Sequence, residues 1–151
     1  MNEMIPLSDP HRKSLLQDFK AFYLKPDAAS LERADRLYTQ DIEFRDPLHT
    51  IHGILAFKSY LKSVYTGPTD IRFEYLDEQC GEHWACITWV ATYRHGALGG
   101  GRTLELRGTT QIRFTDRIYY QEDFFDVGAM VYQHLPVLGP IVRYINRRIS
   151  R

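Results

Sequence analysis

Apolar residues recur every three or four positions in three stretches of the first 65 residues. Ser8 is placed to cap the first stretch, and Pro26 stops it. The pattern predicts helices over residues 9–24, about 27–40 and 54–65. Their apolar positions include Leu15, Leu16, Phe19, Phe22, Tyr23, Leu31, Ala34, Leu37, Tyr38, Ile54, Phe57, Leu61 and Val64.

A short strand interrupts this helical pattern at IEFR, residues 42–45. It runs into Asp46-Pro47 and then a loop that holds His49 and His52. A strand that ends on a carboxylate held by proline can be a surface turn or the edge of a site. Which of the two applies depends on where the fold of the remaining chain places this turn.

The period of the apolar residues changes to two after Asp70. Four strands are predicted over residues 71–79, 83–95, 102–115 and 118–125, joined by turns that contain Gly81, glycines 99–101 and Asp116. Odd positions of the second strand and even positions of the third are mostly apolar. One face of this antiparallel meander is therefore expected to be buried and the other wet.

The last stretch, residues 127–151, returns to a helical pattern with interruptions at Leu135-Pro136 and Gly139-Pro140. Separate blocks of helices and strands favour an α+β fold with helices on one face of a curved sheet. A cavity is expected where sheet and helices diverge. The absence of repeats or a long linker predicts a single domain over residues 1–151.

Composition narrows the classes of function. Nineteen basic residues balance nineteen acidic ones, so the average charge gives no reason to expect nucleic acid. Neither a leader pattern nor an apolar run long enough for a bilayer is present, which predicts a cytoplasmic protein. Cys80 and Cys86 are expected to be reduced, partly buried thiols.

Two motifs and the order of elements carry a family resemblance. With LYTQDIEFRDPLHTIHG before a helix and YYQEDFFDVG after the meander, the chain resembles the nuclear transport factor 2-like superfamily, in its SnoaL-like and ketosteroid-isomerase-like branch. The resemblance implies a cone-shaped barrel: a strongly bent, mainly antiparallel sheet wrapped around N-terminal helices, with a C-terminal helix. It also implies a pocket at the open end and a homodimer formed through the sheet.

The resemblance implies two candidate catalytic acids. Asp46 matches the isomerases' base before proline, and Asp123, of inward parity on the last strand, matches the acid of SnoaL-like cyclases. The isomerases' oxyanion donors fall at Phe19 and Thr110 here, which argues against classical ketosteroid isomerisation. Only another tyrosine close to Asp46 would restore a donor.

The superfamily that the chain resembles also includes an epoxide-hydrolase-like branch. It uses an arginine between two acids, and Arg107 and Arg113 have outward parity, which counts against it. His49 and His52 could shuttle protons or bind metal, but no third ligand is placed to join them, so we expect a polar rim and no metal or cofactor.

The predicted pocket residues are polar or aromatic and have inward parity or lie on helices that face the sheet. Tyr38 and Tyr60 are assigned to helices. The set is Tyr38, His49, Tyr60, Trp89, Tyr93, Thr110 and Gln121.

Two functions of different class follow. The first is a protein that binds a small hydrophobic, weakly polar ligand and catalyses proton transfer or water addition through Asp46 and Asp123. The second is a non-catalytic binding or accessory module that uses the same pocket. A third hypothesis concerns IVRYINRRISR, residues 141–151, whose apolar and basic sides would suit an anionic membrane surface.

Overall fold

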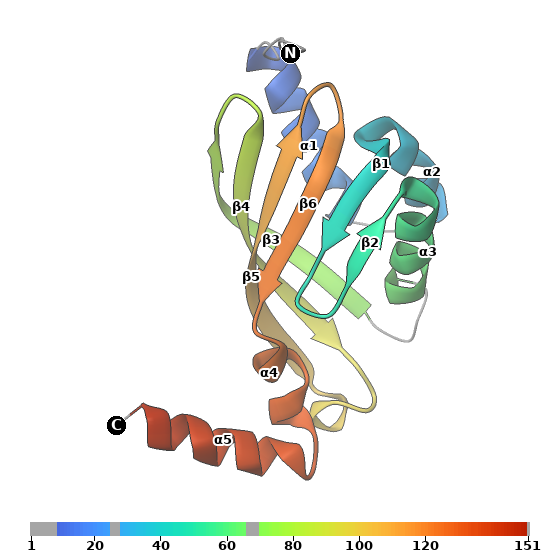
Figure 1. Cartoon of the computed structure of the whole chain (residues 1–151). Helices are drawn as coiled ribbons and strands as arrows, with labels where there is room; N and C mark the ends of the chain where they lie inside the picture. Colours follow the sequence, from blue (N-terminus) through green and yellow to red (C-terminus); the bar gives the residue numbers. More distant parts are fainter. Residues whose placement is uncertain (1–8, 25–27, 66–69, 151) are drawn as a thin grey trace.

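The computed structural model describes residues 9–24, 28–65 and 70–150. The first half of the chain contains three helices and a β-hairpin (Figure 1). All three helices have the predicted apolar face. Helices α1 and α3 also begin and end at the predicted residues. The elements are α1 (Asp9–Leu24), α2 (Ala28–Leu37), β1 (Tyr38–Arg45), β2 (Thr50–His52) and α3 (Ile54–Tyr65).

The second half supplies the four long strands of the meander. These are β3 (Asp70–Cys80), β4 (Trp84–Arg94), β5 (Thr103–Phe114) and β6 (Ile118–Phe125). In the described part of the chain the strand order is β2-β1-β6-β5-β4-β3, and only the β1–β6 pair is parallel. The sheet is curved and does not close into a complete barrel (Figure 1).

The core lies between the inner face of the sheet and the N-terminal helices. Phe19 and Phe22 of α1 pack in one cluster with Phe57 of α3 and with Ile87 and Ile112 of the sheet. A second cluster around Trp89 and Leu106 occupies the other end of the same face. The alternation predicted for β4 and β5 is confirmed, since every second side chain is buried.

The α+β cone predicted from the sequence is therefore the fold observed. Burial of apolar residues on one side of a bent sheet places the helices there, as the layer argument requires. Three short elements complete the chain at the open end: α4 (Val127–Met130), a 3-10 turn η2 (Tyr132–His134) and α5 (Leu138–Ile149).

Some local predictions were wrong. Tyr38 begins β1 and is not helical, because it pairs with Ile118 of β6. Residues 50–52 form a strand against β1 rather than a loop. Gly139-Pro140 does not interrupt α5, because Pro140 lies in its first turn, where no helical N–H partner is lost.

The cysteines are free, and Cys80 is exposed rather than partly buried. Cys80 pairs with Ala85 and Cys86 with Gln79, so the two thiols are not opposite each other. The predicted cap at Ser8 and the stop at Pro26 lie outside the described residues. Within the described ranges, no helix is long and apolar enough to cross a membrane.

Candidate functional site

A cavity of about 500 Å³ lies at the open end of the cone, between the inner face of the sheet and helices α1, α3 and α4. Its wall is mainly apolar and aromatic. Residues from the β1–β2 turn, from the β4–β5 loop and from α4 form the rim. The described lining residues include Phe19, Tyr23, Val64, Ile71, Phe73, Trp89, Leu106, Phe125 and Met130.

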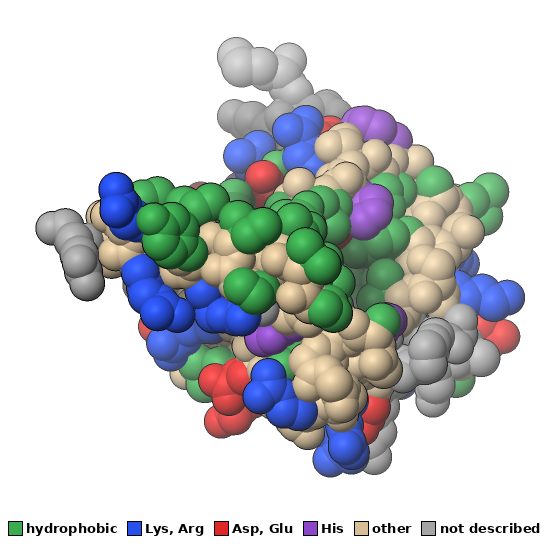
Figure 2. Space-filling view, turned by 90° about the horizontal axis from the view of Figure 1, so that it is seen from below, with side chains coloured by type: hydrophobic (Ala, Val, Ile, Leu, Met, Phe, Trp, Pro, Cys, Tyr) green, Lys and Arg blue, Asp and Glu red, His purple; other side chains and the backbone are tan. Residues whose placement is uncertain are grey.

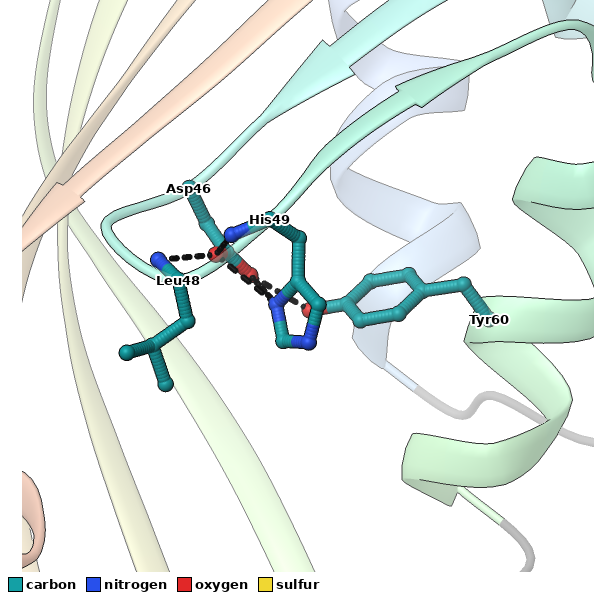
Figure 3. Close-up of polar contacts among 4 residues, drawn as sticks. All are labelled: Asp46, Leu48, His49 and Tyr60. Atoms are coloured by element: carbon teal, nitrogen blue, oxygen red, sulfur yellow. Dashed lines mark hydrogen bonds and ion pairs between the residues drawn. The ribbon is translucent and has the colours of Figure 1, made fainter.

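Asp46 lies where β1 enters this rim, and its side chain is only 3% exposed. One oxygen, Oδ1, accepts hydrogen bonds from the backbone N–H groups of Leu48 (2.8 Å) and His49 (2.7 Å). The other, Oδ2, accepts one from the Tyr60 hydroxyl at 2.7 Å. The His49 ring adds a contact from Nδ1, at 2.9 Å from Oδ1 and 3.0 Å from Oδ2 (Figure 3).

These four donors favour a positioning role for Asp46. A carboxylate whose lone pairs are occupied in this way holds the turn and orients its neighbours. The Nδ1 atom of the His49 ring faces the Asp46 carboxylate, which leaves Nε2 directed away from it. The carboxylate also contributes to the charge felt by the second acid, Asp123.

Asp123 comes from β6 and lines the same cavity as Asp46. Its Oδ1 accepts a hydrogen bond from the Thr110 hydroxyl at 2.7 Å and one from the Gln121 amide at 3.3 Å. Among the described residues, none donates to its Oδ2. That oxygen is the one left for a ligand.

Burial is the main cause of the raised pKa of Asp123. The apolar wall penalises the charged form and raises the pKa of Asp123 to about 6, against the lowering effect of Thr110 and Gln121. The negative charge of Asp46 acts in the same direction as burial. A carboxyl group with this pKa can both accept and return a proton near neutral pH.

A chain of hydrogen bonds fixes Asp123 from both sides. The Trp89 indole N–H donates to Thr110 Oγ1 at 2.9 Å, and this hydroxyl in turn donates to Asp123. On the other side, the Tyr38 hydroxyl donates to Gln121 Oε1 at 2.6 Å, which turns the Gln121 amide N–H toward Asp123. Trp89 and Tyr38 thus orient Thr110 and Gln121, whose own donors point toward the carboxyl group, so its orientation is preset.

Tyr75 is the cavity residue that sequence reasoning missed. It lies on β3 beside Ile71 and Phe73, two inward residues of the same parity. Burial and the nearby charge of Asp123 raise the pKa of the Tyr75 phenol, which keeps it protonated. In the described part of the chain its hydroxyl has no hydrogen-bond partner, although the period-two pattern of β3 could have identified it as inward-facing.

A glycine shapes the wall next to Asp123. Gly108 of β5 pairs directly with Trp89 of β4, and a Cβ at this position would lie 2.3 Å from the indole ring. Only glycine leaves room for the ring to lie flat across the strand. The position of the Trp89 N–H, and through it that of Thr110, depends on this space.

Six of the seven predicted pocket residues line the cavity: His49, Tyr60, Trp89, Tyr93, Thr110 and Gln121. Tyr38 does not; it is fully buried behind the wall, where it contacts Tyr23 at 2.7 Å and supports Gln121. His52 is exposed on β2 and is outside the cavity. No arginine is among the described lining residues, and no metal-ligand cluster occurs in the described ranges.

The chain is similar to a known protein family and to solved structures. The model of the SnoaL-like domain matches residues 19–120. No curated protein matches the chain. Among solved structures, an NTF2-like protein of unknown function from Exiguobacterium sp. 255-15 is 20% identical, with a TM-score of 0.62 over 74% of this chain and 98% of the other.

Two further structures show the range of names attached to this fold. A candidate SnoaL-like polyketide cyclase from Jannaschia sp. CCS1 is 11% identical, with a TM-score of 0.69 over 82% of this chain and 93% of the other. An LEH-like epoxide hydrolase from M. tuberculosis is 15% identical, with a TM-score of 0.65 over 80% and 89%. At these identities the likeness extends to the fold alone.

Proposed function

Because the chain belongs to the SnoaL-like domain family, with the cone of the NTF2-like fold, we propose that it is a small-molecule enzyme. Its open-end cavity binds a hydrophobic carbonyl compound, and Asp123 transfers a proton on it. The observation that carries this proposal is Asp123 itself, a preoriented carboxyl group in an apolar cavity with a pKa of about 6 and one free oxygen.

The proton transfer uses groups that already face the cavity. In its ionised form, Asp123 removes a proton from the carbon next to the carbonyl group through Oδ2. The C–H electron pair then forms the enolate, whose charge develops on the carbonyl oxygen. In a β,γ-unsaturated ketone, the enolate electrons extend to the γ carbon, protonated Asp123 returns the proton there, and the double bond moves into conjugation with the carbonyl group. In a ligand with a second carbonyl group, the enolate carbon instead attacks that carbonyl carbon, the C=O π pair becomes an alkoxide, and Asp123 protonates the alkoxide as the ring closes.

An oxyanion donor is needed beside such an acid. Phe19 cannot supply it, but the protonated Tyr75 hydroxyl lies close enough to feel the charge of Asp123. We assign Tyr75 the hydrogen bond to the developing oxyanion. His49, held by Asp46, places Nε2 at the rim as a second hydrogen-bonding group for a hydroxyl group of the ligand.

Epoxide hydrolysis and metal-assisted chemistry fit the residues less well. The cavity wall contains no arginine among its described residues to orient a water between the two acids. The alternative of different class, a non-catalytic binding module, is favoured by the apolar Phe19 at the usual donor position. An assay that measures binding and proton exchange separately distinguishes the two.

The test uses β-tetralone, a hydrophobic ketone with exchangeable α protons. Deuterium incorporation in heavy water, followed by proton NMR, should be accelerated by the wild-type protein. Asp123→Asn should slow the catalysed exchange by at least about a hundredfold, because the transferring group is lost. Tyr75→Phe should slow it by about tenfold to a hundredfold, because one oxyanion donor is lost.

Glu74→Gln is the matched control, since it makes the same carboxylate-to-amide change on the exposed face of β3. Its exchange rate should equal that of the wild type. An unchanged rate in Asp123→Asn would reject the acid–base role. Saturable binding of β-tetralone without any exchange would support the binding module instead.

A further inference from the structure

Helix α5 extends away from the body of the protein below the open end of the cone (Figure 1). Its main packing contact is with the adjacent 3-10 turn η2. Most of its surface therefore faces solvent. A helix exposed to solvent on most sides is expected to carry mainly polar side chains, and α5 does not.

One side of α5 is apolar and exposed. Leu138, Ile141, Val142, Ile145 and Ile149 recur at helical spacing and form a single stripe. Ile141 and Ile145 are 50% and 47% exposed, and Ile149 is 78% exposed. Exposed large aliphatic side chains in a continuous stripe mark a surface that contacts another molecule or a membrane when the protein functions.

The charges on α5 are of one sign. Arg143, Arg147 and Arg148 are its only ionisable side chains apart from Tyr144, and the sequence from 127 to 150 contains no acidic residue. The Arg148 guanidinium lies over the Tyr144 ring, 6.0 Å from its centre. In a chain whose total formal charge is zero, this helix is a local cationic surface.

Helix α5 follows shortly after residues that line the cavity. Met130 of α4 and the following Val131 line the cavity, and α5 begins seven residues further on, at Leu138. Two hydrogen bonds fix this connection: Tyr93 donates to the Met130 carbonyl at 2.7 Å, and His134 Nε2 contacts the Ala129 carbonyl at 2.9 Å. Seen from below, hydrophobic side chains gather along this end of the molecule, with basic side chains along one margin (Figure 2).

We propose that α5 docks the protein on an anionic phospholipid surface, with its apolar stripe in the interface and its arginines at the headgroups. A helix with one apolar face and basic flanks lies in the plane of such an interface. Each arginine near an anionic surface strengthens the attraction. The cavity mouth would then face the membrane, the compartment in which hydrophobic ligands concentrate.

A lipid surface explains the stripe better than a protein partner. The helix has 12 residues, which is about 18 Å of length, so the stripe is far smaller than the roughly 800 Å² that each partner contributes to a standard protein interface. A second copy of this chain would also have to supply acidic groups opposite three arginines. Anionic lipid headgroups supply such groups at every position on the membrane surface.

The experiment is flotation of the full chain with vesicles of phosphatidylcholine alone and of phosphatidylcholine mixed with phosphatidylglycerol. Wild-type protein should float with the mixed vesicles only, and less at high salt. Ile141→Ser/Ile145→Ser and Arg147→Gln/Arg148→Gln should each reduce partitioning by about tenfold or more. Both pairs are exposed, so thermal unfolding should remain at the wild-type temperature.

Matched controls make the same chemical changes elsewhere. Leu55→Ser removes an aliphatic side chain that is 80% exposed on α3, and Arg72→Gln/Arg107→Gln removes two exposed charges from the sheet. Both should float like the wild type. Wild-type protein that stays at the bottom with mixed vesicles, or controls that lose as much as the α5 variants, would overturn the proposal.

The docking proposal stands independently of the catalytic one. The α5 variants leave every residue of the cavity unchanged, so they should keep the wild-type rate of β-tetralone exchange in solution. Dimerisation that depends on Ile141 and Ile145 without vesicle binding would show that a second copy covers the stripe, and would also overturn the proposal.

Discussion

Asp123 is a carboxyl group whose two oxygens have different surroundings. Oδ1 is held by Thr110 and Gln121, while Oδ2 has no donor among the described residues. Asp46, directly after the end of the neighbouring strand β1, has donors at both oxygens. Two acids in one cavity are therefore unequal: Asp123 keeps one oxygen without a donor among the described residues, and both oxygens of Asp46 accept hydrogen bonds.

The raised pKa of Asp123 has a consequence for stability. The native state binds the proton more tightly than the unfolded chain does, so this group stabilises the fold below about pH 4, and the contribution is lost as the pH rises through about 6. Asp123→Asn removes this dependence. Its unfolding free energy relative to wild type should therefore increase by about 2 to 3 kcal/mol from pH 4 to pH 7.

Urea unfolding at several pH values measures this difference. Asp41→Asn, a change of the same kind at an exposed position of β1, is the control and should follow the wild type at each pH. A constant difference between Asp123→Asn and the wild type would mean that Asp123 is not preferentially protonated in the fold.

Gly108 gives a second prediction at this scale. Gly108→Ala places a methyl group against the Trp89 ring, so the ring must move or the strands must separate. We expect a loss of about 1 to 3 kcal/mol in unfolding free energy and weaker binding of β-tetralone. At Gly96 a Cβ meets nothing within 4 Å. Gly96→Ala should therefore be neutral in both measurements, and equal effects at the two positions would contradict the packing argument.

At the scale of the elements, the hairpin of β1 and β2 is joined to α3 through the side chain of Asp46. Asp46 accepts from the two backbone N–H groups of its own turn and from Tyr60 of α3. It therefore ties the hairpin to the helix beside it. His49, whose ring also contacts Tyr60 with 5.1 Å between ring centres, completes this connection.

Asp46→Ala should destabilise the fold by about 2 to 3 kcal/mol, because four donors lose their common acceptor at once. Tyr60→Phe removes the hydrogen bond from the Tyr60 hydroxyl to Asp46 and should cost about 1 kcal/mol. Thermal or urea unfolding compares the two. If Asp46→Ala costs no more than Tyr60→Phe, the turn does not depend on the carboxylate.

The elements that could be predicted from the sequence are those with a local signal. Alternation identified β3 to β6 within one or two residues at each end, and the period of apolar residues identified α1 and α3. Tyr38 was misassigned because its place is decided by pairing with Ile118, which is far away in sequence. The strand β2 has only three residues, too few for a periodic pattern.

The site shows the same division between local and distant causes. Inward parity was sufficient to place Trp89, Thr110 and Gln121 in the cavity, and it would have placed Tyr75. Parity could not predict that Asp46 is saturated by donors, since three of its four contacts depend on the fold of the turn. The clearance at Gly108 likewise depends on strand register.

At the scale of the whole molecule, the outer face of the sheet is the surface on which the expected homodimer would form. Phe124 is 44% exposed there, in register with Thr109 of β5 and, through it, with Thr88 of β4. We predict a dimer through this face. Phe124→Asp should convert it to a monomer in sedimentation velocity, because a charge would be buried in the interface.

Leu55→Asp on the solvent side of α3 is the control for added charge and should leave the sedimentation coefficient unchanged. Wild-type protein that sediments as a monomer at all concentrations would reject the dimer. A Phe124→Asp protein that remains dimeric would move the interface to another face.

The open sheet leaves β3 as an edge strand in the described structure. Its pairing with β4 slips between Tyr75 and Asp77, and the outward side of the strand carries Arg72 and Glu74. A bulge and alternating charges hinder a further strand from adding to such an edge. Where the slip starts, Tyr75 faces the cavity. One irregularity next to Tyr75 therefore also guards the protein against polymerising edge to edge.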